Sequence, residues 1–201
     1  EYGGIYLDTD VKVCRSFDPL LSYPAFFNFI FDCSVGSAII GAQPGNPLVK
    51  ALLDMYDATE FGRNPDGKVF NFRDGRLIVD GYATSNYYYT YYILKHYPQF
   101  RLNNQFQDLG DFVIFPKELF EIGTITGKQY AVHLCAGEWR LKTDDSKTMK
   151  NRIKKMIGKW PWLFDKVQIL VRKKRYDKLK TQIPFYEYYL AQKENHPLPE
   201  L

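Results

Sequence analysis

The chain has 201 residues, 45% of them hydrophobic and 17% aromatic, and a formal net charge of +4 at pH 7. This length and composition fit a globular core of one domain, with or without an appendage. The three cysteines, Cys14, Cys33 and Cys135, are odd in number and form no Cys-x-x-Cys pair, so neither a zinc knuckle nor a disulfide framework is indicated and a reducing cytosol is favoured. No signal peptide is visible, and no run approaches the roughly 18 apolar residues of a membrane span.

The first predicted strand, residues 5–8, ends in an Asp-x-Asp sequence. Its apolar residues are β-prone and follow a glycine pair, and side chains alternate along a strand, so Asp8 and Asp10 share one side. Two carboxylates at this spacing suit Mg²⁺ or Mn²⁺, which leave their remaining positions to phosphates and water. The same pattern is also compatible with a simple turn, because Asp readily hydrogen-bonds the local backbone.

The later elements follow from capping, periodicity and turn signals. Asn46 can cap a helix that has Pro47 in its first turn, and Asp74-Gly75 is a strong hairpin signal. We expect strands at residues 11–14, 25–31, 37–42, 68–72, 76–79, 111–115 and 129–134, and a second helix at 84–96. We expect the first helix to bury a face with Leu48, Leu52, Met55 and Tyr56, and the second to carry Tyr88, Tyr91 and Tyr92 on one face.

Alternating strands and helices predict an α/β fold with a layered sheet. In such folds ligands bind beyond the carboxyl ends of the strands, where we expect Asp8, Asp10 and His133 to lie. A lone histidine is compatible with either a structural role or a metal ligand. The sequence therefore predicts a site at one edge of the sheet.

A phosphatase of the haloacid-dehalogenase type also places Asp-x-Asp after an apolar strand, with the first Asp as nucleophile. That family has a small hydroxyl residue two places after the second Asp, where this chain has Lys12. It also needs a later acidic pair at a strand end, whereas Asp144-Asp145 precedes a basic helical pattern. The phosphatase is therefore the minor alternative, and a non-catalytic basic interaction domain is a third.

The context of the Asp pair resembles the Asp-x-Asp-containing, sugar-binding glycosyltransferases of family 32. The family pattern Tyr-Gly-Gly-x-Tyr-x-Asp-x-Asp is matched by Tyr2, Gly3, Gly4, Tyr6, Asp8 and Asp10. Residues 36–42 and 45–48 are similar to a family strand and the helix after it. Residues 133–139 are similar to the closing His...Gly-Ser-Trp motif, with Glu138 where the family usually has Ser.

The resemblance implies an A-type, Rossmann-like nucleotide-sugar fold over residues 1–139. Asp10 would bind the Mn²⁺ or Mg²⁺ directly, while Asp8 would bind it through water or hold hydroxyls of the donor. His133 would be a further metal ligand. Glu138 and Trp139 would lie near the nucleotide or the sugar.

The activity implied is transfer of a sugar from a UDP- or GDP-sugar to a glycan or lipid-linked acceptor, with retention of configuration. Members act in cell-surface polysaccharide synthesis, such as that of capsule and lipopolysaccharide, and include fungal mannosyltransferases. The family carries its first nucleotide-binding strands before the Gly-Gly motif, so we expect an N-terminally truncated piece of such an enzyme.

The C-terminal part has a different charge balance from the rest. Residues 140–180 contain 15 Lys or Arg against 4 Asp or Glu. Two amphipathic basic helices are predicted, separated near Pro161; their apolar stripes hold Met149, Ile153, Met156 and Ile157, and Leu163, Val167, Leu170 and Val171. We expect residues 140–201 to form a mainly helical extension, either packed on the domain or bound through 147–180 to an anionic membrane at its cytoplasmic face. No recognition motif supports nucleic-acid binding.

Overall fold

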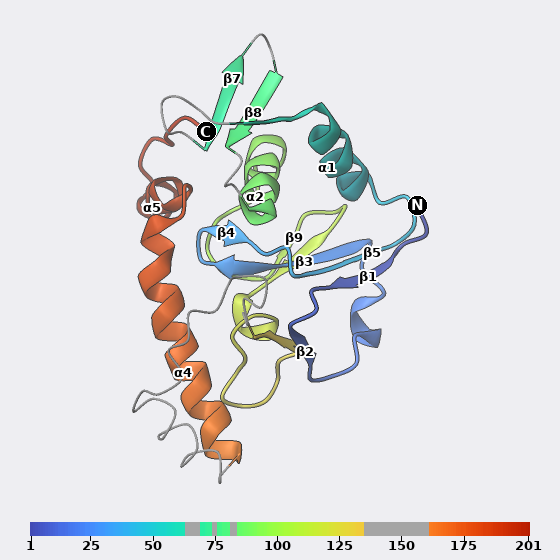
Figure 1. The fold of residues 1–201 in the computed structure, drawn as a ribbon, viewed down its shortest axis with the longest axis vertical. Helices are drawn as coiled ribbons and strands as arrows, with labels where there is room; N and C mark the ends of the chain where they lie inside the picture. The colour runs from blue at the N-terminus through green and yellow to red at the C-terminus, as the bar shows by residue number, and fades with distance from the viewer. Residues whose placement is uncertain (63–68, 74–75, 81–83, 135–160) are drawn as a thin grey trace.

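The fold is known from a computed structural model, which describes all residues except 63–68, 74–75, 81–83 and 135–160 (Figure 1). It is a mixed α/β fold, as the sequence predicts. The elements, in chain order, are β1 (Gly4–Leu7), β2 (Val11–Val13), η1 (Asp18–Leu20), β3 (Ala25–Phe31), β4 (Ser34–Val35), β5 (Ile39–Ala42), α1 (Pro47–Ala58), β6 (Glu60–Gly62), β7 (Phe70–Arg73), β8 (Arg76–Asp80), α2 (Ser85–His96), β9 (Gln107–Asp108), β10 (Val113–Phe115), η2 (Lys117–Leu119), β11 (Ala131–His133), α4 (Pro161–Leu179), η3 (Lys180–Gln182) and α5 (Tyr186–Glu194).

The central sheet has the strand order β1-β5-β3-β10-β9, with β4 paired to β3. β5 is antiparallel to both β1 and β3, while β3 and β10 are parallel, so β1, β3 and β10 run in one direction. Two smaller sheets are present among the described residues: β2 pairs with β11, and β8 lies between β6 and β7. The sheet is therefore mixed rather than uniformly parallel.

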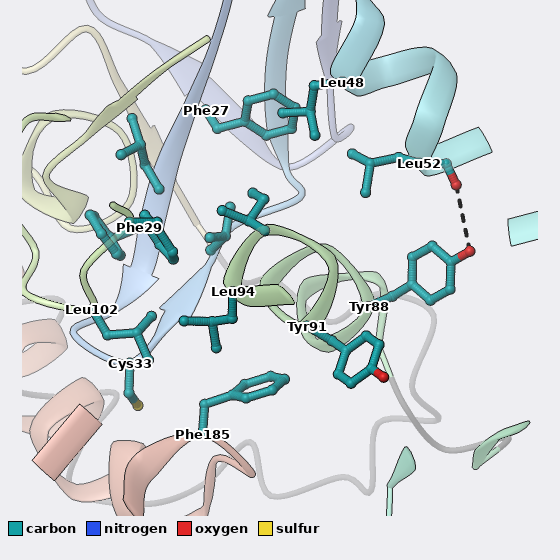
Figure 2. Packing of buried hydrophobic residues seen from close by; sticks show 14 of the residues in the cluster. Phe27, Phe29, Cys33, Leu48, Leu52, Tyr88, Tyr91, Leu94, Leu102 and Phe185 are labelled. Atoms are coloured by element: carbon teal, nitrogen blue, oxygen red, sulfur yellow. Dashed lines mark hydrogen bonds between the residues drawn. The ribbon is translucent and has the colours of Figure 1, made fainter. Parts of the chain in front are cut away.

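Alternation along β3 builds a layer on each face of this sheet. Phe27 and Phe29, both fully buried, belong to the cluster that also holds buried residues of α1 and α2 (Figure 2). Phe26 belongs to the cluster on the other face, beside Phe120. The neighbouring Asn28 is also buried and contacts the segment after η2.

Most predicted elements are present with shifted ends. Asn46 caps α1 by accepting a hydrogen bond from the Val49 N–H (3.1 Å), as expected. Leu48 and Leu52 of α1 are buried, but Tyr56 is 51% exposed, so that part of the predicted core face is wrong. Strands β4, β6 and β9 and helix α5 were not anticipated by the sequence patterns. The predicted hairpin forms between β7 and β8, although its turn residues lie outside the described part.

The C-terminal helices pack against the sheet and α2. Phe185 and Tyr188 belong to the same core cluster as Phe27 and Phe29. The first predicted basic helix lies outside the described residues, and the second corresponds to α4, which begins at Pro161. Its predicted apolar stripe does not face the core, because Leu170 and Val171 are each 56% exposed. None of the helices among the described residues is long and apolar enough to cross a membrane.

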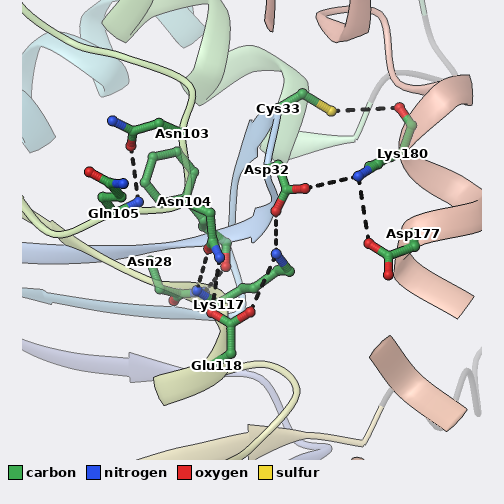
Figure 3. Close-up of polar contacts among 11 residues, drawn as sticks. Asn28, Asp32, Cys33, Asn103, Asn104, Gln105, Lys117, Glu118, Asp177 and Lys180 are labelled. Atoms are coloured by element: carbon green, nitrogen blue, oxygen red, sulfur yellow. Dashed lines mark hydrogen bonds and ion pairs between the residues drawn. The ribbon is translucent and has the colours of Figure 1, made fainter. Parts of the chain in front are cut away.

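An ion-pair network fixes the end of α4 to the end of β3 (Figure 3). The Asp32 carboxylate bonds both the buried Lys117 ammonium and the Lys180 ammonium, the latter at 3.1 Å. Burial alone would raise the pKa of Asp32, but its bonds to Lys117 and Lys180 lower it. Asp32 therefore stays ionised and joins η2 and η3 to the central sheet. Lys180 also pairs with Asp177 of α4 (3.6 Å).

Candidate metal centre

A tight turn carries the two aspartates from the end of β1 to the start of β2. The Val11 N–H donates to the Asp8 carbonyl (3.1 Å), which closes the turn, and the Asp8 N–H donates to the Ala38 carbonyl (2.9 Å). The interpretation of the Asp-x-Asp sequence as a turn is therefore correct for the backbone of these residues. The same turn leaves both carboxylates only partly covered and close together, so a structural turn and a ligand site coincide here.

The ribbon of β2 and β11 brings His133 to this turn. In its antiparallel register His133 lies opposite Val11, directly after Asp10. The Leu134 N–H also donates to the Asp10 carbonyl (2.9 Å), which fixes the end of β11 to the turn. As a result, His133 Nε2 lies 3.2 Å from Asp10 Oδ1.

Asp8, Asp10 and His133 form a group that could hold a metal ion. One ligand atom from each of them lies within 4.8 Å of the others, and all three residues are half-buried. Two carboxylates and one imidazole supply hard oxygen donors and one nitrogen donor, a set that fits a divalent cation such as Mn²⁺ or Mg²⁺.

Tyr6 donates a hydrogen bond to the first aspartate of the turn. Its hydroxyl donates to Asp8 Oδ1 (2.6 Å), and this hydrogen bond raises the pKa of Tyr6 to about 12. The hydroxyl therefore stays protonated at neutral pH and orients the Asp8 carboxylate. Tyr6 as a whole is 57% exposed, so its ring offers a flat apolar surface beside the site.

Behind His133 lies a buried carboxylate that sequence reasoning missed. Glu121 Oε2 is 2.9 Å from His133 Nδ1, on the side of the ring away from Asp10. Glu121 is completely buried and also accepts hydrogen bonds from Asn28 and Tyr176. The only signal in the sequence is an acidic residue between Phe120 and Ile122, two residues that are themselves buried.

The structure brings together three of the five predicted site residues. Asp8, Asp10 and His133 meet at the turn, as their expected places at strand ends implied. Glu138 and Trp139 lie outside the described residues, so their roles stay a prediction. Asp144-Asp145, which the phosphatase alternative would need, also lies outside them.

Comparison with known proteins gives two partial relatives. The chain is 41% identical over 49 residues to inositol phosphoceramide mannosyltransferase 3 of Schizosaccharomyces pombe, covering 24% of this chain and 14% of that protein. It is 41% identical over 59 residues to mannosyl phosphorylinositol ceramide synthase SUR1 of Saccharomyces cerevisiae, covering 28% of this chain and 15% of that protein. The matched segments thus span about one seventh of each relative. No family model and no solved structure matches the chain.

Both relatives are named as enzymes of mannosyl transfer, and both are fungal. Their names support glycosyl transfer in general. They do not support the expectation of a bacterial capsule or lipopolysaccharide enzyme in particular, which stays a prediction.

Proposed function

We propose that this protein is a metal-dependent glycosyltransferase that moves a sugar from a nucleoside-diphosphate sugar to an acceptor hydroxyl. The observation that carries this proposal is the group of Asp8, Asp10 and His133 at the end of β1. The partial similarity to two enzymes of mannosyl transfer supports the choice of sugar transfer over phosphate hydrolysis. The A-type nucleotide-sugar fold is part of the proposal, and the mixed sheet is compatible with it.

The proposed roles of Asp8, Asp10, His133 and Tyr6 are supported by their contacts at the turn. Asp10 and His133 would hold the cation directly, and Asp8, oriented by the Tyr6 hydroxyl, would hold it or the donor's hydroxyls. When bound, the cation would supply positive charge to the departing diphosphate. The Tyr6 ring, largely exposed beside Asp8, would pack against the donor. Glu138 and Trp139 are proposed to approach the nucleotide or the sugar.

The donor and acceptor can be narrowed from the relatives. Their names favour mannose as the sugar, carried by GDP or UDP, and an inositol-phosphate lipid as the acceptor. By its resemblance to family 32, transfer would retain the anomeric configuration, with the acceptor hydroxyl attacking beside the leaving phosphate. The leaving phosphate would then take the proton of the acceptor hydroxyl, so no separate side-chain base is needed.

This proposal is tested by measuring donor binding with and without a cation. We expect isothermal titration calorimetry to detect binding of a GDP- or UDP-sugar in the presence of Mn²⁺ or Mg²⁺. Chelation of the cation by EDTA should remove this binding, because the diphosphate would then face two carboxylates without a neutralising charge. Donor binding of equal strength in EDTA would contradict the proposal.

The outer face of α4 supports an anionic membrane as a further proposed partner. Leu170 and Val171 share this face with the exposed Lys174 and Lys178, at spacings of three, four and seven or eight residues. It lies opposite Tyr176, which is buried against the domain. Aliphatic side chains among lysines are typical of helices that lie on anionic bilayers. Such a position, at the cytoplasmic face of a membrane, would suit an enzyme with a lipid acceptor.

Reversing one charge on this face should weaken membrane binding. We expect Lys174→Glu to weaken binding to vesicles containing phosphatidylserine by at least about fivefold, measured by co-sedimentation, since each basic residue near the surface contributes about 1 kcal/mol. The matched control is Lys50→Glu, which changes the same charge on the exposed side of α1. Equal losses in the two variants, or binding that is insensitive to salt, would argue against α4 as the contact.

A further inference from the structure

We infer that Glu121 is a positioning residue for His133, and that helix α4 takes part in this through Tyr176. The inference rests on the proposed metal site and concerns the side chains that contact its histidine from behind. Glu121 does not face the turn itself. It acts by fixing which nitrogen of His133 is available to the metal.

The contact of His133 with Glu121 determines how the imidazole is presented. A carboxylate only accepts hydrogen bonds, so His133 Nδ1, 2.9 Å from Glu121 Oε2, carries the hydrogen in this contact. Nε2 is then the nitrogen directed toward Asp10 Oδ1, 3.2 Å away. Histidines that bind metals commonly donate their other N–H to a carboxylate, which sets the ring orientation and raises the basicity of the ligand nitrogen.

Glu121 is held on several sides, so its own position is fixed. Asn28 Nδ2 of β3 donates to Glu121 Oε1 (3.1 Å), and the Tyr176 hydroxyl of α4 donates to Oε2 (3.3 Å). The Glu121 N–H donates to the Lys117 carbonyl (2.7 Å), and its carbonyl accepts from the His133 N–H (3.2 Å). A completely buried carboxylate with this many donors has little freedom to move.

Gly36 lies against both Asn28 and Glu121 and shows how closely these two side chains are packed. A Cβ atom at Gly36 would lie 2.8 Å from Asn28 Nδ2 and 3.1 Å from Glu121 Oε1. A side chain there would push on the Asn28 amide and on the Glu121 carboxylate oxygen that accepts its hydrogen bond. Glycine at this position therefore fits the need to keep Glu121 in place behind His133.

Helix α4 is anchored so that Tyr176 reaches Glu121. The Tyr176 ring packs on Phe31 at the end of β3, with 5.1 Å between ring centroids. One turn further on, Lys180 binds Asp32, the residue that follows Phe31 (Figure 3). The end of β3 thus contacts α4 by a ring and by an ion pair. Helix α4 is in this way connected to the proposed metal ligand His133 through Tyr176 and Glu121.

The test is Mn²⁺ binding to the full chain, measured without donor by calorimetry and by the EPR signal of free Mn²⁺. Glu121→Gln keeps the shape but replaces one oxygen by an N–H donor, in a place where three donors already converge. We expect about tenfold weaker Mn²⁺ binding, within the range of about 10–100-fold for partners of metal-bound histidines. Tyr176→Phe keeps the ring on Phe31 and should weaken binding by a smaller factor.

The matched control is Glu118→Gln, the same substitution three residues earlier. Glu118 is part-exposed and contacts Asn104 (2.9 Å) and Lys117 (3.5 Å). In a His133→Ala background, Glu121→Gln should cause no further loss, because its effect passes through the imidazole. A second readout needs no metal: with ¹⁵N-labelled histidine, the Nδ1–H resonance of His133 should shift or disappear in Glu121→Gln while those of His96 and His196 stay unchanged.

The outcomes separate this inference from the proposed function. Mn²⁺ binding that Glu121→Gln leaves unchanged, or weakens equally without His133, would overturn the positioning role and leave the metal site standing. An equal loss in Glu118→Gln would overturn it too. A wild-type chain that binds no Mn²⁺ would overturn the metal site and this inference together.

Discussion

Replacing Asp10 with alanine is expected to weaken Mn²⁺ binding by more than about 100-fold, beyond the loss typical of an outer-sphere partner. The variant removes one of two anionic ligands and leaves Nε2 of His133 without the oxygen 3.2 Å away. Donor binding should then be weak and equal with or without Mn²⁺. Calorimetry with Mn²⁺ alone, and then with a GDP- or UDP-sugar, measures both effects.

The backbone contact of residue 10 with β11 should survive this substitution. This contact uses the backbone carbonyl, which accepts from the Leu134 N–H, so the β2–β11 ribbon should still form. Asp54→Ala is the matched control, because it removes the same charge from an exposed position on α1. If Asp10→Ala binds the donor as the wild type does, with the same metal dependence, the proposed site is wrong.

Replacing Phe27 with alanine is expected to lower the free energy of unfolding by about 3–5 kcal/mol, the usual cost of removing a buried phenylalanine. Phe27 is fully buried and makes an edge-to-face contact with Phe112, with 5.6 Å between centroids. Alanine would leave a cavity between the central sheet and the helices above it. Urea unfolding followed by circular dichroism measures this loss: the difference in the free energy of unfolding is given by the shift of the urea midpoint when the m-value is unchanged.

Phe106→Ala serves as the comparison for this core variant. Phe106 is 47% exposed and lies near the sheet edge, in contact with the rings of Tyr23 and Phe115. Its removal exposes little new surface, so its effect should be well below that of Phe27→Ala. Similar losses in both variants would show that the cluster around Phe27 is not the main source of stability.

The parts of the site that the sequence predicts correctly are those with local signals. A β-prone run followed by two aspartates is visible in ten residues, and it places Asp8 and Asp10 on one turn. His133 is placed near the site by its position at the end of a predicted strand, and the similarity of residues 133–139 to a family motif adds its role as a metal ligand. Its meeting with Asp10 depends on the pairing of β2 and β11, which no local pattern specifies.

Glu121 could not be predicted, because its role is defined by residues scattered along the chain. Its partners come from β3, β11 and α4, and none has a fixed spacing from it. The orientation of α4 was likewise ambiguous. The stripe with Leu170 and Val171 is compatible with packing on the domain or with binding to a membrane, and the helix buries Tyr176 on the opposite side, because Phe31, Glu121 and Asp32 provide partners there.

The missed elements have physical reasons of their own. β4 and β9 have two residues each and β6 has three, too few for alternation to be recognised. Helix α5 is rich in tyrosine, a modest helix former, and is stabilised by the packing of Tyr188 in the core rather than by its own propensity. The formation of these elements therefore depends on tertiary contacts rather than on local sequence patterns.

The pairing of β2 with β11 has a consequence for the order of events in folding. The aspartates leave the ribosome long before His133, since chains emerge and fold from the N-terminus onward. During synthesis the early turn is therefore an incomplete chelator with weak affinity for free cations. Tight capture becomes possible only after the distant strand docks. Metal affinity would thus report whether this long-range contact has formed, and a bound ion would hold the early turn and β11 together against unfolding.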